Sequence, residues 1–316
     1  MKEFLLFSSL IYGSLAVGWV IRRIVPSVER HSRLLSRFTL LATETPLIFL
    51  VYWDVDAHAF RSYMPIALAA IVVLSVSGFA GYVISRRACR DQAARGAFVV
   101  SSMFSNVGST MGGFLCLLYL GDEGLVASQF FALLAIPYYF TVVFTVARRF
   151  AGGQRRGVWE AIRANFGDPM AALPLIAIVV GLTLGISGVT MPDFLDLPRR
   201  VLVFAAVILF ALSFGLTAQI RVMLRRFREY VTMLPVKFVV APLTGLVIVL
   251  IAGYSPTSNP LLFKVILIQS MMPVAIWSVV AAKLFRLDDH LALGLWIFTT
   301  LSVSALVPLV GWIAGL

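Results

Sequence analysis

Cysteine, histidine and charged residues are all scarce in this 316-residue chain. Its two cysteines, Cys89 in an arginine-rich segment and Cys116 in an apolar one, are too few for a disulfide framework. None of its three histidines falls inside a long apolar segment, and the chain contains neither a His-Glu-x-x-His nor a Walker sequence. The sequence therefore predicts no metal site, no cofactor and no catalytic residue, and we expect that the protein is not an enzyme.

Extended polar segments are also missing. Hydrophobic residues make up 60% of the chain and charged residues 13%, and the mean hydropathy is +0.95. A soluble domain contains about 45–50% and about 25%, respectively, because it must cover its surface with polar groups. The composition excludes a soluble protein and indicates an exterior that faces lipid.

Long apolar runs occupy most of the sequence. A helix needs roughly 20 apolar residues to cross the hydrocarbon core of a bilayer. Ten runs of about this length are bounded by charged or turn-forming residues, at 4–21, 34–53, 64–84, 98–120, 125–147, 169–190, 201–220, 231–253, 261–284 and 291–313. The sequence therefore predicts an all-α polytopic membrane protein with ten transmembrane helices.

The distribution of basic residues predicts how these spans are oriented. Lys2 and Glu3 precede the first run and their charges cancel, so this run is expected to be a retained helix and not a signal peptide. Of the 26 Lys and Arg residues, 20 fall in alternate loops, at 22–37, 86–95, 148–163, 221–228 and 283–286. Because Lys and Arg accumulate on cytoplasmic loops, we expect a cell-membrane protein with both termini extracytoplasmic. Contact with the anionic inner leaflet accounts for the net charge of +11 without nucleic acid.

The number of spans favours an internal repeat. Two halves of five helices each, at 1–147 and 169–316 with a cytoplasmic linker at 148–168, would enter the membrane from opposite sides, which is an inverted-topology repeat. The fourth and ninth spans are followed by similar short acidic segments, at 121–125 and 287–291.

The fourth and ninth spans also contain helix-breaking residues. Residues 101–113 include three glycines and six Ser, Thr or Asn residues, and residues 269–278 include Pro273. Backbone groups freed at membrane depth must find partners in protein, water or a ligand. Paired breaks in inverted halves are typical of the binding site of a secondary transporter. The alternative is that Gly108, Gly112 and Gly113 only permit close packing of helices.

These segments resemble the auxin efflux carrier family of ten-helix permeases for organic anions, whose fold is shared broadly with bile acid symporters. The residues that carry the resemblance are Asn106-Val107-Gly108 to Gly113, Tyr119 to Glu123, Lys237 with Pro242, Met272-Pro273-Val274-Ala275, Ala281, Leu287-Asp288, Thr299 to Ser302 and Pro308-Leu309. The resemblance implies that helices 4 and 9 are broken and cross each other. Family members often have a proline a few residues after the Asn and Gly of the fourth helix, where this chain has Gly112 and Gly113.

We therefore expect a secondary transporter that carries a small organic anion, a carboxylate by resemblance, by alternating access at a crossover site near the membrane midplane. The expected substrate-binding residues are Ser105, Asn106, Gly108, Thr110, Ser270, Pro273, Ser278, Thr299, Thr300 and Ser302. The expected partners are this anion, the lipid bilayer and a coupling ion, H+ or Na+, and a homodimer is compatible with the sequence. A sodium-coupled symporter of the bile acid type and a membrane-embedded ligand sensor stay open as alternatives.

Two charged residues fall within predicted spans. Glu44 lies near the middle of the second span, where a carboxylate is expensive and usually faces a cavity or a partner. It is either a proton carrier that couples transport or a structural carboxyl held neutral by Thr43 or Thr45, and the sequence does not decide between these. Lys237 lies in the eighth span, and we expect its side chain to extend to the cytoplasmic face and not to bind the anion.

Overall fold

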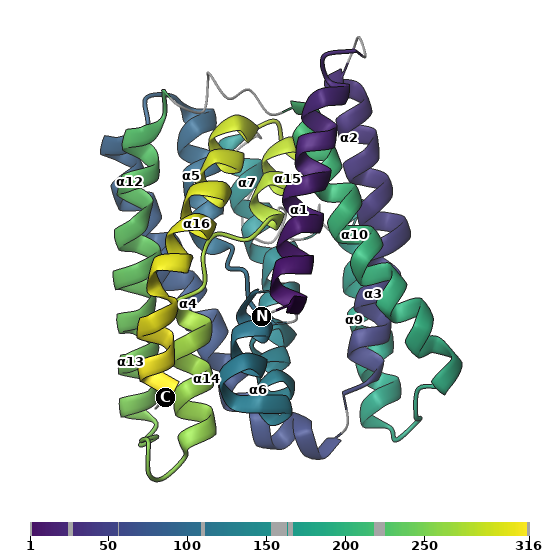
Figure 1. Ribbon diagram of the computed structural model, residues 1–316, viewed down its shortest axis with the longest axis vertical. Coiled ribbons are helices and arrows are strands. Elements are labelled where there is room, and N and C mark those ends of the chain that lie inside the picture. The colour runs from purple at the N-terminus through teal and green to yellow at the C-terminus, as the bar shows by residue number, and fades with distance from the viewer. Residues whose placement is uncertain are drawn as a thin grey trace. The chain divides into compact units, whose positions relative to one another are not determined.

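A computed structural model of the chain describes residues 2–24, 28–55, 57–108, 111–152, 163, 167–217 and 225–314. All regular secondary structure in these ranges is helical (Figure 1). The α-helices are α1 (Lys2–Ile21), α2 (Val28–Phe38), α3 (Thr45–Trp53), α4 (Ala57–Ala88), α5 (Gln92–Met103), α6 (Met111–Tyr138), α7 (Phe144–Phe150), α9 (Pro169–Ile186), α10 (Asp196–Thr217), α12 (Phe227–Pro235), α13 (Ala241–Ile251), α14 (Pro260–Ser270), α15 (Trp277–Leu284) and α16 (Asp289–Ala314). Four shorter helical turns are η1 (Thr39–Glu44), η2 (Tyr139–Val143), η3 (Asp193–Leu195) and η4 (Val236–Val240).

Among the described residues, six helical segments are long and apolar enough to cross a membrane, and they coincide with six of the predicted spans: Arg30–Trp53, Phe60–Ala88, Glu123–Phe150, Pro169–Ile186, Asp193–Thr217 and Phe227–Ile251. Four shorter apolar helices fall where the other four spans are predicted: Tyr12–Ile21, Met111–Gly121, Pro260–Ser270 and Asp289–Val303. This all-helical architecture is that of a polytopic membrane protein.

Three of the long helices contain a π-helical turn. η1 joins α2 to α3, η2 joins α6 to α7, and η4 joins α12 to α13. A proline stands two residues after η1 and η4, at Pro46 and Pro242, and two residues before η2, at Pro137. Because proline lacks a backbone N–H, it removes one α-helical hydrogen bond and lets the neighbouring turn widen.

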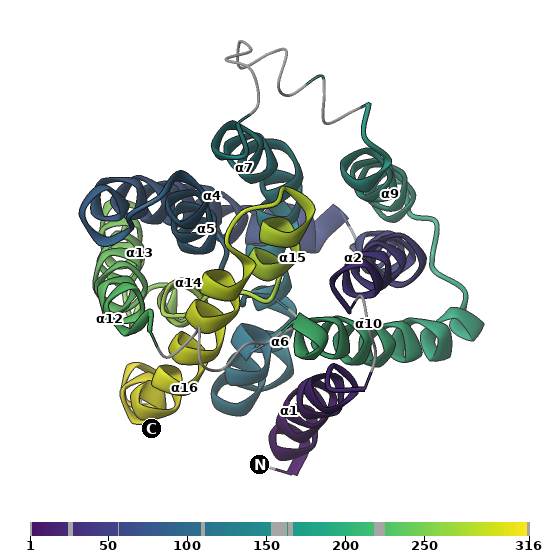
Figure 2. The ribbon, with the colours of Figure 1, turned by 90° about the horizontal axis from the view of Figure 1, so that it is seen from above.

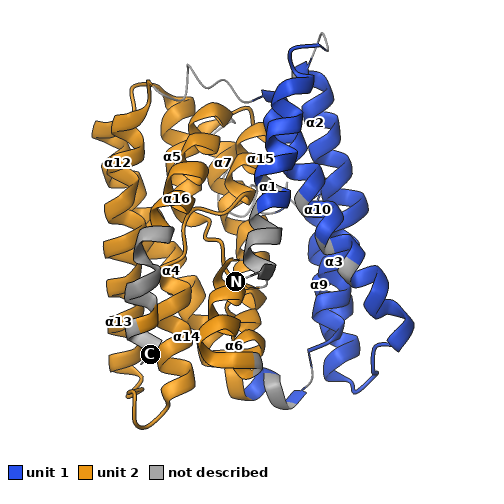
Figure 3. Cartoon of the chain, viewed as in Figure 1, with its two compact units in different colours: residues 1–61, 156–220 blue, residues 62–155, 221–316 orange. Residues whose placement is uncertain are grey.

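The chain divides into two compact units (Figure 3). The first consists of residues 1–61 and 156–220, and the second of residues 62–155 and 221–316. Each unit therefore combines segments from both sequence halves. The compact units are defined by packing, whereas the two predicted repeats are defined by their order along the sequence. The division into repeats therefore stays a prediction.

In the first unit, α10 lies between α1 and α2 (Figure 2), and α3 packs against α9. Glycines lie at the contact of α1 with α10 and at the contact of α9 with α3. A Cβ atom at Gly18 of α1 would lie 2.3 Å from the carbonyl oxygen of Leu212, and one at Gly181 of α9 would lie 2.5 Å from that of Phe49. These close backbone contacts are typical of helices packed within a membrane.

In the second unit, α6 and α13 pack against α14, and α16 packs against α5, α12 and α15. Gly121 divides α6, because its φ of 71° and ψ of −162° are not helical. The first part of α6 therefore belongs to the fourth predicted span and the second part to the fifth.

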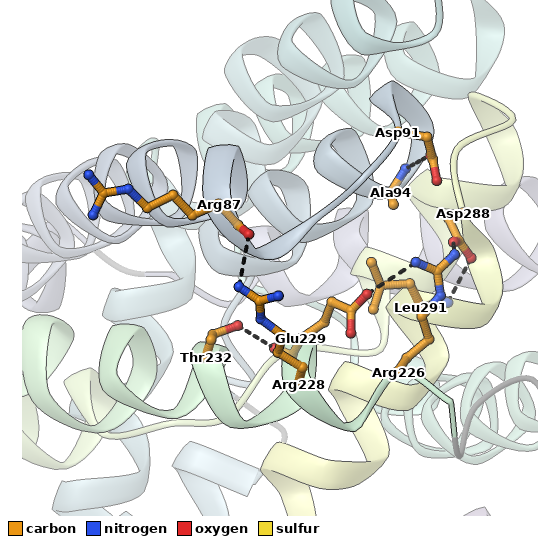
Figure 4. Close-up of polar contacts among 9 residues, drawn as sticks. All are labelled: Arg87, Asp91, Ala94, Arg226, Arg228, Glu229, Thr232, Asp288 and Leu291. Atoms are coloured by element: carbon orange, nitrogen blue, oxygen red, sulfur yellow. Dashed lines mark hydrogen bonds and ion pairs between the residues drawn. The ribbon is translucent and has the colours of Figure 1, made fainter.

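A polar network holds one end of the second unit together (Figure 4). Arg226, just before α12, donates to Glu229 at 3.1 Å and to Asp288 at 2.8 Å. Asp288 also accepts the backbone N–H of Leu291 at 2.9 Å, in the first turn of α16. Beside this network, burial and then the Glu229 carboxylate raise the pKa of the Cys89 thiol to about 12. The network ties the start of α12 to the start of α16.

Candidate functional site

The two predicted helix interruptions are both present, and both lie in the second unit. α5 ends at Met103, and the next residue, Phe104, is extended with φ −95° and ψ 131°. α14 ends at Ser270 and α15 begins only at Trp277. Pro273 lies in this second gap, where its missing N–H and its ring prevent a continuous helix. We call residues 104–108 the first break and residues 271–276 the second break.

The two breaks are joined directly by their backbones. The N–H of Asn106 donates to the carbonyl oxygen of Pro273 at 2.9 Å. The carbonyl oxygen of Asn106 accepts the N–H of Gly112, at the start of α6, at 3.0 Å. The freed N–H of Asn106 is therefore satisfied across the junction between two segments that are more than 160 residues apart in sequence, and its carbonyl oxygen is satisfied locally.

Gln269, at the end of α14, also bridges the breaks, although the sequence did not single it out. Its side chain is fully buried, Oε1 accepts the N–H of Gly108 at 3.1 Å, and Nε2 donates to Sγ of Cys116 at 3.3 Å. A Cβ atom at Gly112 would lie only 2.4 Å from Oε1 of Gln269. Gly112, which stands in the region where the family often has proline, is therefore needed for this close approach.

A side chain from another helix fixes the backbone of each break. The hydroxyl of Tyr139 donates to the carbonyl oxygen of Ser105 at 3.2 Å and accepts its N–H at 3.3 Å. Oγ1 of Thr299, in α16, accepts the N–H of Val274 at 3.1 Å. Tyr139 lies in the fifth predicted span and Thr299 in the tenth, and each contacts the backbone of one break. Tyr139 was not predicted, and the only sequence signal for it is Pro137 nearby.

The side chain of Lys237 does not lie where the sequence predicts it. Its side chain is fully buried in η4, and Nζ donates to the carbonyl oxygen of Phe104 at 2.7 Å and to Oγ of Ser105 at 2.8 Å. The prediction that it extends to the cytoplasmic face is therefore wrong. The reason is that the first break supplies uncommitted oxygen acceptors inside the protein, so that the ammonium does not need to reach the membrane surface.

The other predicted site residues differ in how their polar groups are used. The hydroxyl of Ser270 donates to the carbonyl oxygen of Ile266, and that of Ser302 to the carbonyl oxygen of Phe298, each within its own helix. Thr110 lies outside the described residues.

Three of the predicted site residues have side-chain polar groups for which no hydrogen-bond partner is found among the described residues. Ser278 and Thr300 have buried hydroxyls with no hydrogen-bond partner in the described part of the chain. The side-chain amide of Asn106 is half-buried, and no hydrogen bond to it is found among the described residues. Buried hydroxyls without partners are uncommon in proteins, and a bound ligand is one way to satisfy them.

Glu44 ends η1 in the first unit and is partly buried. The hydroxyl of Thr43 donates to the carbonyl oxygen of Thr39 at 2.5 Å, and that of Thr45 to the carbonyl oxygen of Leu40 at 2.9 Å. A hydroxyl has a single proton to donate, so neither threonine donates to the Glu44 carboxyl in this arrangement. Each threonine hydroxyl oxygen can still accept a hydrogen bond from a protonated carboxyl, so both interpretations of Glu44 stay predictions.

Taken together, the two breaks and the side chain of Lys237 bring backbone N–H and carbonyl groups, the amide of Asn106 and a basic amino group into the second unit. Neither a family model nor a curated protein matches this chain. Within the described residues, no group of three or more His, Cys, Asp or Glu side chains is placed to hold a metal ion. The groups found at the site are backbone hydrogen-bond donors and acceptors, an amide and one basic side chain.

Proposed function

We propose that this protein is a secondary active transporter of the auxin efflux carrier type, with ten spans, which carries a small organic anion across the cell membrane. The observation that carries the proposal is the junction of the breaks, where the N–H of Asn106 meets the carbonyl oxygen of Pro273. Interrupted helices that meet within a membrane protein are the usual binding site of secondary transporters. The substrate class, a carboxylate, follows from the family resemblance and from the donors that line the junction.

The helix packing supports two inverted halves. In the first unit, α1 packs against α10 and α9 packs against α3, which pairs span 1 with span 7 and span 6 with span 2. If each of the first five spans is exchanged with its counterpart among the last five, the pair of spans 1 and 7 becomes the pair of spans 6 and 2. The same exchange relates the first break to the second, and Tyr139 to Thr299 as their anchors. We propose that substrate is released alternately on the two sides as one unit moves against the other.

The unpaired polar groups define how the anion is bound. The amide of Asn106 donates to the carboxylate, and the hydroxyls of Ser278 and Thr300 supply further donors. Glu44, in the first unit, takes up and releases the proton that couples transport to the membrane gradient. The loops rich in basic residues face the cytoplasm.

The orientation can be tested by labelling with an impermeant thiol reagent in intact cells. Single cysteines at Asp193 and Ser258, both exposed, should react, whereas a cysteine at the exposed Arg90 should react only after the membrane is permeabilised. The reason is that Arg90 belongs to a basic loop and the other two do not. The opposite labelling pattern would reverse the proposed topology.

Transport is tested with purified protein in proteoliposomes and a panel of small organic anions. For an anion that is transported, Asn106→Ala should lower the flux roughly tenfold, because one well-placed polar contact of about 1.5 kcal/mol is lost. The protein should still fold, since the amide of Asn106 holds no other described residue.

Asn259→Ala is the matched control. Asn259 is exposed before α14, and its side chain does not cap that helix. Its flux should equal that of the wild type. Equal flux in Asn106→Ala would remove Asn106 from the site, and binding of an anion without any flux would favour the ligand sensor over the transporter.

A further inference from the structure

The first break is contacted by a basic side chain from η4. Lys237 is fully buried, and it lies at the eleventh position of the 25-residue helical segment Phe227–Ile251. Its Nζ donates to two oxygen atoms of the first break, the carbonyl of Phe104 at 2.7 Å and the hydroxyl of Ser105 at 2.8 Å. Phe104 and Ser105 are buried as well.

No carboxylate forms an ion pair with this ammonium among the described residues, where the ion pairs found have Arg199 and Arg226 as their cations. Neutral oxygens compensate only part of the cost of removing a charge from water. An ammonium has three N–H donors, and the described contacts use two of them. The described part of the chain therefore supplies acceptors for this positive charge but no counter-charge.

Freed carbonyl oxygens at broken helices are also the groups that coordinate a coupling cation such as Na+ in secondary transporters. Here a carbonyl and a hydroxyl oxygen of the first break already hold a cation, which is tethered to η4. A metal ion at the same two oxygens would have to displace the ammonium and would meet its like charge.

We propose that Lys237 is the resident cation of the first break, so that the protein binds its anion without Na+ and favours substrates with a single negative charge. This inference rests on the proposed transport function and specifies its coupling and its substrate class. The single charge of Lys237 is balanced by one carboxylate, and a second carboxylate on the substrate would enter the site without a counter-charge. Lys237 acts as a positioning residue through its charge and through the backbone of the first break.

The test begins without substrate, on purified protein in detergent, by measuring Tm in chloride salts of equal ionic strength. The Tm of the wild type should be the same in sodium, potassium and choline. Lys237→Ala should lower Tm by about 5 °C or more, because two buried acceptors lose their donor and a cavity is left. Methylammonium, ethylammonium or propylammonium should restore part of this loss, and choline, which is too large and has no N–H, should not.

Lys264→Ala is the matched control, because Lys264 lies in α14 of the same unit but is partly exposed. Its Tm should not respond to alkylammonium ions. If Lys237→Ala does not fold, Lys237→Met keeps the volume of the side chain without its charge, and it should fold with a Tm that no cation raises. Specific stabilisation of the wild type by Na+, or the absence of any alkylammonium effect on a folded Lys237→Ala protein, would overturn the inference.

The flux measurement separates this inference from the proposed function. Wild-type flux of a monocarboxylate should be unchanged when choline replaces Na+, and a dicarboxylate of similar length should compete at least tenfold more weakly. Flux that requires Na+ would refute the resident cation but would leave the transporter intact. Failure to transport any anion would refute the proposed function, while the Tm measurements would still decide the role of Lys237.

Discussion

Gly108→Ala is expected to abolish transport and to destabilise the protein by roughly 2–5 kcal/mol. Gly108 has a φ of +67°, where an alanine costs about 1–2 kcal/mol. A Cβ atom there would also lie 2.5 Å from Cβ of Ala132, and such overpacking costs about 1–3 kcal/mol. The shift would in addition move the Gly108 N–H away from Gln269 and distort the first break.

Two other glycines separate these contributions. Gly121 has a φ of 71° and a ψ of −162°, a region that is essentially restricted to glycine, and nothing lies within 4 Å of an added Cβ atom, so Gly121→Ala should show a conformational cost of about 1–3 kcal/mol without overpacking. Gly13, in α1, has open space around an added Cβ atom, and Gly13→Ala should leave Tm unchanged or slightly higher. Thermal unfolding in detergent and proteoliposome flux are measured for all three variants. A Gly108→Ala protein as stable and active as Gly13→Ala would contradict the geometry of the first break.

Glu44→Gln is expected to abolish accumulation of the anion driven by a pH gradient while leaving substrate exchange measurable. Glutamine keeps the shape and much of the hydrogen bonding of a protonated carboxyl, but it cannot take up or release a proton. Binding should survive, because the residues proposed to bind the anion lie in the second unit and Glu44 lies in the first. The measurement is accumulation in proteoliposomes under an imposed pH gradient, together with exchange at equal pH on both sides.

Glu123→Gln serves as the control for this experiment. Glu123 is an exposed carboxyl at the start of the segment Glu123–Phe150, so its neutralisation should not affect coupling. If Glu44→Gln accumulates the anion as the wild type does, Glu44 does not carry the coupling proton. The coupling group would then have to be sought elsewhere in the chain.

The sequence by itself determined the class of the protein and the positions of the breaks. Apolar runs and alternating basic loops are local or additive properties, so composition is sufficient to read them. Gly108 and Pro273 break helices through their own backbone chemistry, wherever their neighbours lie. The position of Glu44 within a span follows in the same way from the apolar residues on either side of it.

Only the tertiary structure decided which groups satisfy the broken backbone. Side chains that contact the backbone of the first break include those of Tyr139, Lys237 and Gln269, which are 34, 133 and 161 residues away in the contacts that they make. No local pattern specifies such a partner, because the choice depends on which helices come close enough to form a hydrogen bond. Local sequence therefore led to the wrong prediction for Lys237, whose acceptors lie in the first break, after the end of α5.

The use of individual hydroxyls was decided in the same way. Ser270 and Ser278 looked alike in the sequence, but Ser270 ends a regular helix and bonds the carbonyl oxygen four residues earlier. Ser278 lies in the first turn of α15, where no helical carbonyl stands four residues before it, and its hydroxyl is left without a partner among the described residues. The interleaving of both sequence halves in each unit was likewise set by long-range packing, because side chains in a membrane select neighbouring helices by shape and not by order along the chain.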